Sequence, residues 1–215
     1  MTTNQITTPV VAKSSGLSDA IEFTKTVVVI VTLVLVIRGS LIEPFKIPSG
    51  SMRPTLLEHD YLFVSKLSYG IRLPFITNML WQYAFPKRGD VVVFTRPDDP
   101  TTAGKDESED NLIKRVMGLP GEKIEVRGDK VYINAEPLTE PYARWIEGGV
   151  TDFPATTVPA GHVLLLGDNR DQSKDSRFWI PSPFLDVQRI KGRALFIFWT
   201  WDLDRLWERV GKIIR

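Results

Sequence analysis

Two serines that flank a glycine are the first residues in the chain whose types and spacing suit catalysis. Ser49, Gly50 and Ser51 lie between Pro48 and Pro54. Prolines restrict the backbone on either side and glycine permits a tight turn, so a serine hydroxyl can stand clear of the backbone as a nucleophile. The same residues also fit a Ser/Gly linker, and this segment considered alone favours the linker.

A serine nucleophile needs a general base, and the sequence offers few candidates. The chain has no cysteine and two histidines, His59 in a polar turn and His162 at the start of a strand-like run, so a Ser-His-Asp triad is disfavoured. A lysine that burial keeps neutral can serve instead. Strand alternation directs Lys114 to the same face as Leu112 and Val116, which would desolvate its amine and lower its pKa. The alternative is an ordinary lysine whose stem packs on the sheet while its amine reaches water.

A dense polar loop can support such a lysine. Gly167–Arg177 reads GDNRDQSKDSR and follows the apolar run Val163–Leu166. The loop can supply a hydroxyl that orients the amine and a carboxylate–guanidinium pair that braces the backbone. Considered alone, it is a solvated charged loop.

Composition argues against several other kinds of chemistry. The 215 residues include 27 Lys or Arg and 26 Asp or Glu, so the net charge of +1 provides no field that would recruit nucleic acid. Without cysteine, and with two well-separated histidines, neither a metal site nor a cofactor is expected. Hydroxyl, amine and carboxylate chemistry remains.

One apolar run near the N-terminus predicts a membrane anchor. Thr26 to Ile37 contains no charge, and Phe23 to Ile42 reaches the roughly 20 residues of a membrane span if its flanking lysine and arginine extend to the interfaces. We expect a disordered tail over 1–22 and an uncleaved transmembrane helix over 23–42. A buried strand or a removable signal peptide fits less well.

Short β-type segments separated by glycine and proline predict a mainly β domain over 43–201. The expected strands are Tyr61–Ser65, Asp90–Thr95, Leu112–Met117, Lys123–Val126, Lys130–Ile133, His162–Leu166 and Arg193–Trp199. Gly128-Asp129 predicts a hairpin between the fourth and fifth of these. We expect residues 97–111, with six acids and one lysine, to form a solvated loop.

The last residues alternate apolar and basic side chains at a helical spacing. From Leu203 onwards, apolar residues recur on one side, namely Leu206, Trp207, Val210, Ile213 and Ile214. The other side carries the basic residues Arg205, Arg209, Lys212 and Arg215. We therefore expect an amphipathic helix over 202–215. Docking onto the sheet and lying on an anionic membrane surface both remain open.

Taken together, these segments resemble one family, the bacterial type I signal peptidases, which are membrane-bound serine proteases with a Ser-Lys dyad. The resemblance covers about 37–215. It rests on the anchor and on boxes in the family's order, namely Pro-Ser-Gly-Ser-Met-x-Pro-Thr-Leu at 48–56, Gly-Asp-Val-Val-Val-Phe at 89–94, Lys-Arg-x-x-Gly-Leu-Pro-Gly at 114–121, Gly-Asp-Asn-Arg at 167–170 and Ser-Arg at 176–177.

The resemblance implies a role for each matching catalytic residue. Ser51 matches the nucleophile and Lys114 the general base. Ser49 matches the residue whose hydroxyl joins the backbone N–H of the nucleophile in the oxyanion hole. Ser173 matches the serine that hydrogen-bonds the lysine amine.

Further positions match supporting residues of the family. Asp175 and Arg177 match a bracing ion pair. Ile47 and Ile113 match positions that shape shallow pockets for the small residues at −1 and −3 of a signal peptide. Ile180 departs from the pattern, which usually has glycine there, so the turn after Trp179 is expected to differ.

The resemblance also implies a fold, an activity and a location. The expected fold is mainly β, a signal-peptidase-type antiparallel β-sheet catalytic domain with one N-terminal transmembrane helix. The expected activity is removal of N-terminal signal peptides from exported precursors after small-x-small motifs, with the substrate extended along 110–117. The partners would be signal peptides and the phospholipid membrane, with no nucleic acid. The tail would be cytoplasmic and the β domain on the outer side of the bacterial plasma (inner) membrane.

Two alternatives stay open at this point. A related Ser-Lys protease, such as a conjugation-type maturation peptidase, would process one dedicated substrate. An anchored β domain without activity would bind a partner.

Overall fold

The computed structural model describes residues 16–71, 79–95, 111–145, 148–149 and 151–215. The chain divides into two units, Met1–Arg38 and Gly39–Arg215. The start of the expected tail, residues 1–15, and the expected acidic loop, except for Asn111, lie outside the described residues.

The described part of the N-terminal unit, from Gly16 to Arg38, belongs to helix α1 (Gly16–Ser40). It begins seven residues before the expected span, and Ile42, the last residue of that span, starts strand β1 instead. The apolar side chains of Phe23, Val28 and Val29 are more than half exposed. Among the described residues, the structure contains no helix that combines the length and the apolarity needed to span a bilayer.

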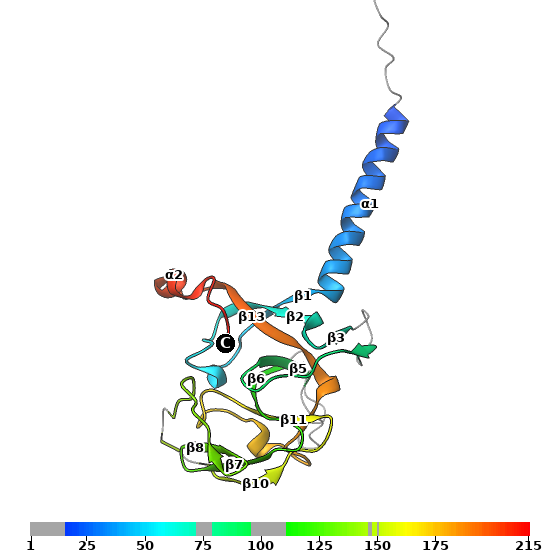
Figure 1. The fold of residues 1–215 in the computed structure, drawn as a ribbon. Coiled ribbons are helices and arrows are strands. Elements are labelled where there is room, and N and C mark those ends of the chain that lie inside the picture. Colours follow the sequence, from blue (N-terminus) through cyan, green and yellow to red (C-terminus); the bar gives the residue numbers. More distant parts are fainter. Residues whose placement is uncertain (1–15, 72–78, 96–110, 146–147, 150) are drawn as a thin grey trace, which may run out of the picture. The chain divides into compact units, whose positions relative to one another are not determined.

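The second unit is built on antiparallel sheets, as predicted (Figure 1). Its largest sheet has seven strands in the order β1-β2-β13-β5-β6-β11-β12. These strands are β1 (Ile42–Lys46), β2 (Asp60–Ser65), β5 (Val91–Thr95), β6 (Asn111–Gly118), β11 (His162–Leu166), β12 (Leu185–Asp186) and β13 (Ile190–Thr200). Strand β5, which is far from β13 in sequence, pairs with it on one side and with β6 on the other.

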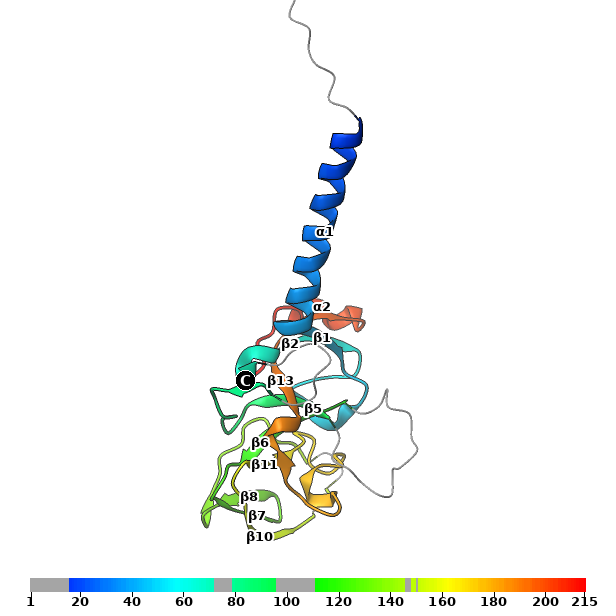
Figure 2. The same cartoon turned by 90° about the vertical axis from the view of Figure 1, so that its right-hand side faces the viewer.

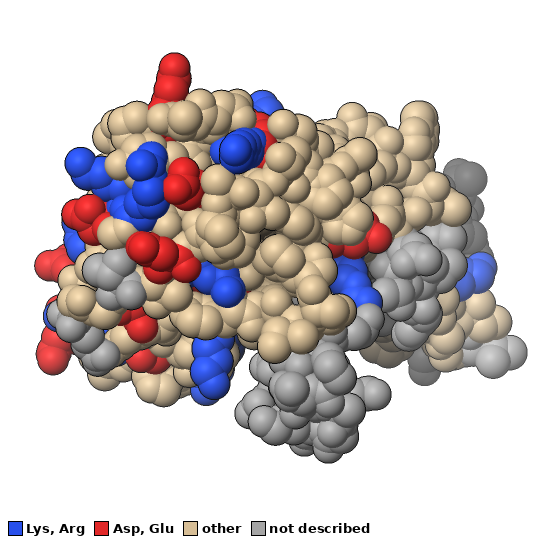
Figure 3. Space-filling model, turned by 90° about the horizontal axis from the view of Figure 1, so that it is seen from below, with Lys and Arg blue, Asp and Glu red and all other residues tan. Residues whose placement is uncertain are grey.

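A four-stranded sheet in the order β10-β7-β8-β9 lies at the other end of this unit from β1 and β2 (Figures 1 and 2). Its strands are β7 (Lys123–Arg127), β8 (Lys130–Ile133), β9 (Glu136–Pro137) and β10 (Phe153–Thr157). The face seen from below mixes lysine and arginine with aspartate and glutamate (Figure 3). A two-stranded sheet joins β3 (Gly70–Ile71) and β4 (Trp81–Gln82).

All seven expected strands are present, with bounds shifted by a few residues at most. The predicted hairpin is confirmed, since β7 pairs with β8 and Gly128 has the positive φ of 59° that its turn requires. Strands β1, β3, β4, β9, β10 and β12 were not predicted. Most of these are only two residues long, too short to show a period.

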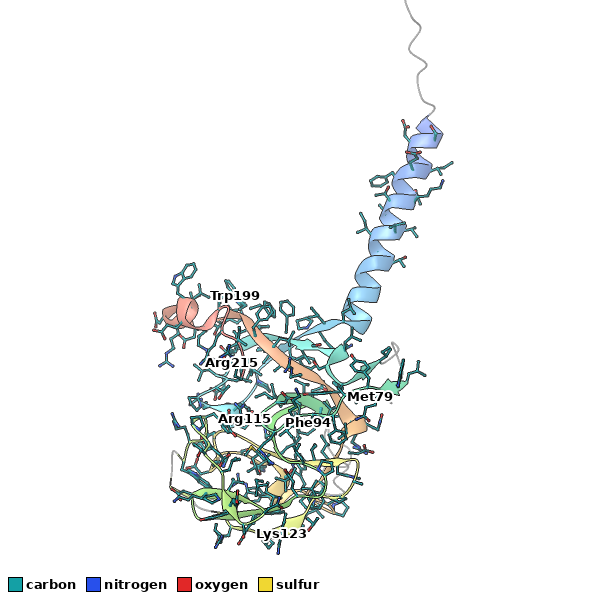
Figure 4. The ribbon with its side chains drawn as sticks, viewed as in Figure 1. Met79, Phe94, Arg115, Lys123, Trp199 and Arg215 are labelled. Atoms are coloured by element: carbon teal, nitrogen blue, oxygen red, sulfur yellow. The ribbon has the colours of Figure 1, made fainter. Side chains whose placement is uncertain are left out.

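Three clusters of buried apolar side chains fill this unit. One packs beneath β1, β2 and β13 and includes Ile47, Met52 and Ile113. A second surrounds Phe94, which Figure 4 labels in the interior. The third joins β11 to the smaller sheet through residues such as Leu164. The first cluster holds both segments that carry the candidate nucleophile and base.

The prediction of a helix over 202–215 is wrong. The chain forms a 3₁₀ turn over Leu203–Arg205, a single α-helical turn, α2 (Leu206–Arg209), and then turns back at Gly211, whose φ is +84°. Ile213 bridges Phe196 of β13 and Ile214 packs on the first cluster, so backbone pairing and burial replace the helix. The glycine was the signal against a longer helix.

Candidate active site

Ser51 lies in a short 3₁₀ helix, Gly50–Met52, directly after the Pro48-Ser49 segment. Met52 is fully buried in the first apolar cluster and anchors this turn, and Leu56 donates a backbone hydrogen bond to Met52 O at 2.9 Å. The Ser51 side of the turn is therefore fixed by packing, with the residue only 8 % exposed.

Lys114 reaches this turn from the central strand β6. Its Nζ lies 2.8 Å from Ser51 Oγ and also donates to Ile113 O at 2.8 Å. Sixty-three positions separate the two residues in sequence, and the fold brings them into direct contact. The two residues that the sequence singled out as nucleophile and base thus meet.

Burial sets the protonation behaviour of Lys114, which is 3 % exposed. Burial lowers the pKa of its amine from 10.5 to about 8, although the carboxylates of Asp175 and Asp168 oppose the shift. The expectation that Lys114 is desolvated is confirmed. A substantial neutral fraction is therefore present near pH 8. A neutral amine can accept the Ser51 hydroxyl proton across the same 2.8 Å.

Ser49 is close to the same hydroxyl. Its Oγ lies 3.5 Å from Ser51 Oγ, at the long limit of a hydrogen bond. Ser49 is exposed, so its hydroxyl can rotate towards a group that approaches Ser51.

The Gly167–Arg177 loop holds the Ser51 turn through its backbone. Asn169 N donates to Ser51 O at 3.1 Å, and Asn169 Nδ2 donates to Gly50 O at 3.1 Å. Gly167 approaches even more closely, since a Cβ at that position would lie 2.5 Å from Ser51 O. The loop therefore fixes the backbone from which the candidate nucleophile projects.

A buried ion pair joins this loop to the strand of Lys114. Arg115 binds Asp168 in two places, with Nε to Oδ1 at 2.8 Å and the second nitrogen to Oδ2 at 2.6 Å, and both side chains are 1 % exposed. Thr55 donates to the same carboxylate at 2.5 Å, and Arg115 also donates to the backbone oxygen of Arg215 at 2.9 Å. Figure 4 labels these two arginines near one another.

Asp175 and Arg177 form the ion pair that the resemblance implies. Arg177 Nε donates to Asp175 Oδ1 at 2.8 Å and its Nη2 donates to Oδ2 at 2.9 Å, with both side chains fully buried. Asp175 Oδ2 also accepts from Gly167 N at 2.9 Å. The pair therefore braces the glycine that lies against Ser51.

Ser173 does not make the contact that the resemblance implies. Its Oγ is buried and has no hydrogen-bond partner among the described residues, so the expected bond to the Lys114 amine is absent. The side chain packs over Gly167 instead. In its place, Ile113 O holds the amine.

Ile47 and Ile113, the expected pocket residues, both belong to the apolar cluster beneath the turn and are 2 % and 8 % exposed. Ile180, the departure from the family pattern, lies exposed on the surface.

Neither histidine takes part in the site as described. His162 Nδ1 lies 2.9 Å from Ala160 O, and the backbone of His59 pairs with Ile47 and Trp201. No group of three or more metal-ligating side chains occurs within the ranges that the structure describes.

Three further residues of the site, Arg115, Asp168 and Asn169, lie within the sequence motifs but had no predicted role. The available signal was their type, because arginine, aspartate and asparagine are seldom buried without a specific partner.

Comparison with known proteins places the chain in a family. Residues 20–199 match the family model described as "Signal peptidase, peptidase S26". The chain is 36% identical over 232 aligned positions to signal peptidase I of Pseudomonas fluorescens, covering 90% of this chain and 79% of that one. It is 38% identical over 205 positions to signal peptidase I of Leptolyngbya laminosa, covering 93% and 89%. A signal peptidase I crystal structure from Enterococcus faecalis, 31% identical, matches with a TM-score of 0.39 over 52% of this chain and 98% of that chain. The chain therefore belongs to the signal peptidase family, peptidase S26, and is a serine endopeptidase of that family.

Proposed function

We propose that the protein cleaves N-terminal signal peptides from exported precursors after small-x-small motifs, with Ser51 as nucleophile and Lys114 as general base. One observation carries the proposal, namely the 2.8 Å contact between Ser51 Oγ and a buried lysine amine whose pKa is lowered to about 8. The general activity, removal of signal peptides by a peptidase of this family, is supported by the family match and does not depend on the roles of Ser51 and Lys114.

The reaction needs only groups of this chain and water. Neutral Lys114 takes the Ser51 proton while Oγ attacks the carbonyl at the cleavage site. The Ser51 backbone N–H and the Ser49 hydroxyl stabilise the oxyanion. Protonated Lys114 gives its proton to the leaving amine of the substrate. Lys114, neutral again, then accepts a proton from the water that hydrolyses the acyl-enzyme.

The substrate lies along β6 in this proposal. Strand β5 pairs with Asn111–Arg115 on one side, whereas β11 pairs only with the stretch from Arg115 to Gly118 on the other. Among the described residues, no strand occupies the second edge of Asn111–Lys114. An extended peptide added there reads backbone by hydrogen bonds and alternate side chains by pockets. We assign the pockets for positions −1 and −3 to the surface over Ile47 and Ile113.

We assign supporting roles to three residues of the polar loop. Asp175 and Arg177 keep Gly167 against the Ser51 turn, as their hydrogen bonds suggest. Ser173, whose hydroxyl is buried and unpaired, is proposed to bind the Lys114 amine once substrate is present. This contact would require the side chain to move from its place over Gly167.

We further propose that α1 anchors the enzyme in the bacterial plasma membrane, with the catalytic domain outside the cytoplasm. The apolar side chains of its described part are exposed around the helix, as in a segment that faces lipid. Protease protection of spheroplasts tests the arrangement, because added protease should digest the domain only from the outer side.

The activity is tested with a purified precursor that carries an Ala-x-Ala motif. The full chain in detergent should release the mature protein, and Ser51→Ala, which keeps the fold, should release none. Equal turnover by this variant would overturn the assignment. Cleavage of many exported precursors, rather than one, would separate the proposal from a dedicated maturation peptidase.

A further inference from the structure

A polar cleft of about 810 Å³ opens beside the Ser51 turn. The segment just after Ser51 contributes Arg53 and Glu58 to its wall, Arg144 contributes a second side, and the segment after β13 contributes Trp201 and Arg205. All of these residues belong to the unit formed by 39–215. The proposed catalytic mechanism uses none of them.

Two walls of the cleft are tied to the candidate nucleophile. Arg53 is two residues from Ser51, so the two Cα atoms lie within about 7 Å. Arg144 N donates to Asp168 O, and Arg170 N donates to Arg144 O, each at 2.8 Å. Asn169, between those two loop residues, donates to Ser51 O. The cleft is therefore within reach of the second to fourth substrate residues beyond the cleavage site.

The strand order shows why the substrate would turn into this cleft. The free edge of β6 ends at Lys114, because β11 occupies the same edge from Arg115 onwards. If the signal peptide pairs with the free edge, as proposed above, the mature part cannot continue along β6. The mature part must therefore leave the sheet, and Asn169 lies next to this point because it binds Ser51. Asn169 also forms an isolated parallel β-bridge with Arg144, a residue of the cleft wall.

The charges of the cleft favour an anion. Arg53 is paired with Glu58, and Arg205 lies 3.8 Å from Asp202. The side chain of Arg144 donates only to the carbonyls of Pro141 and Ala143, both through one terminal nitrogen, and no carboxylate pairs with it among the described residues. A guanidinium carries five N–H donors, so most of those of Arg144 remain available to a carboxylate.

We propose that this cleft receives the first residues of the mature chain and that Arg144 determines a preference for an acidic side chain there. This inference rests on the proposed function, since it takes the signal peptide to lie on the free edge of β6. A peptide carboxylate is favoured over a lipid headgroup for two reasons. Arg144 of the cleft wall is connected to the Ser51 backbone through Asn169, and the free edge of β6 ends beside the cleft.

Paired precursor peptides test the proposal. Both carry Ala-x-Ala before the cleavage site, and they differ only by Glu or Gln at the third residue after it. The wild type should cleave the Glu peptide with a kcat/KM about two- to fivefold higher, as expected for a solvent-exposed ion pair. The preference should vanish in Arg144→Gln, persist largely in Arg144→Lys, and shrink at high salt. Arg127 is an exposed arginine on β7, so Arg127→Gln is the matched control. This variant should keep the preference for the Glu peptide.

Within each variant, the ratio of kcat/KM for the Glu peptide to kcat/KM for the Gln peptide does not depend on how much of the protein is folded. Equal cleavage of both peptides by the wild type would overturn the cleft assignment and leave the proposed function standing. Cleavage of neither peptide would contradict the proposed function itself. An Arg144→Gln variant that keeps the peptide preference but loses binding to phosphatidylglycerol vesicles would assign the cleft to a lipid headgroup and overturn the proposal.

Discussion

Arg115 and Asp168 form a buried, two-point ion pair that connects the strand of Lys114 to the loop that binds the Ser51 backbone. Each partner is the sequence neighbour of a site residue, Lys114 in one case and Asn169 in the other. The pair therefore fixes the relative position of the candidate base and the candidate nucleophile, which come from separate segments of the chain.

Removing one partner of this pair should destabilise the fold. Asp168→Asn leaves the Arg115 guanidinium buried without its counter-charge, and breaking such a pair costs about 3–5 kcal/mol. Denaturant unfolding of the full chain in detergent measures the change. Arg127→Gln, which breaks the exposed pair with Glu125, should alter stability by less than about 1 kcal/mol. Similar effects of the two variants would contradict the structural role of Asp168.

Gly167 should not tolerate a methyl group. A Cβ there would lie 2.2 Å from Ser173 Oγ and 2.5 Å from Ser51 O, so the Ser51 backbone must move. Gly167→Ala should lower kcat at least about tenfold, because a displacement of about 1 Å can cost far more than that. Gly149→Ala is the control, since its nearest neighbour is at 3.7 Å. Full kcat in Gly167→Ala would show that the turn does not need this close contact.

Ser49→Ala should remove one oxyanion donor. The expected loss is about 10²–10³ in kcat with KM nearly unchanged, as for other such donors. Steady-state cleavage of a small-x-small peptide provides both constants. An effect mainly on KM would mean that the Ser49 hydroxyl binds substrate in the ground state.

Burial of Lys114 should be measurable as a pH-dependent stability. Its folded pKa, about 8, is below the unfolded 10.5, so the unfolded state binds more protons between these values and stability rises with pH across that window. Well below pH 8 the full penalty applies, about 3–4 kcal/mol at about 1.4 kcal/mol per pKa unit. Lys114→Met should therefore be more stable than wild type at pH 7, and the gap should close as the pH approaches 10.5.

Unfolding of both proteins at pH 7, 8, 9 and 10 measures this gap. Lys123→Met, at an exposed lysine on β7, is the control for loss of a surface amine. A gap that stays constant from pH 7 to 10 would mean that the Lys114 amine is not desolvated in the folded protein.

Sequence reasoning predicted the local features well. Alternation around Lys114 indicated a buried amine, and Gly128-Asp129 indicated the hairpin, because each depends on residues close in sequence. The C-terminal segment shows the limit of such reasoning. Its apolar spacing fits a helix, but Gly211 and backbone pairing with β13 determine the observed path.

The contacts that assemble the site could not be predicted from the chain alone. Asn169 binds Ser51 across more than a hundred residues, and which loop meets which turn depends on the order of strands in the sheet. Ser173 is a case in which the sequence pattern implied a contact that the structure does not contain. Its place in the family pattern implied a hydrogen bond to Lys114, but its side chain packs over Gly167 without a hydrogen-bond partner among the described residues.

The most direct test of the account is the pH dependence of kcat/KM for the wild type and Lys114→Arg, measured with an Ala-x-Ala precursor. The wild type should gain activity as pH rises through an ionisation near 8, because only the neutral amine can accept the Ser51 proton. Lys114→Arg keeps the positive charge but cannot lose its proton, so it should be at least about 10²-fold less active at every pH. Substantial activity of Lys114→Arg at neutral pH would contradict the assignment of Lys114 as the base.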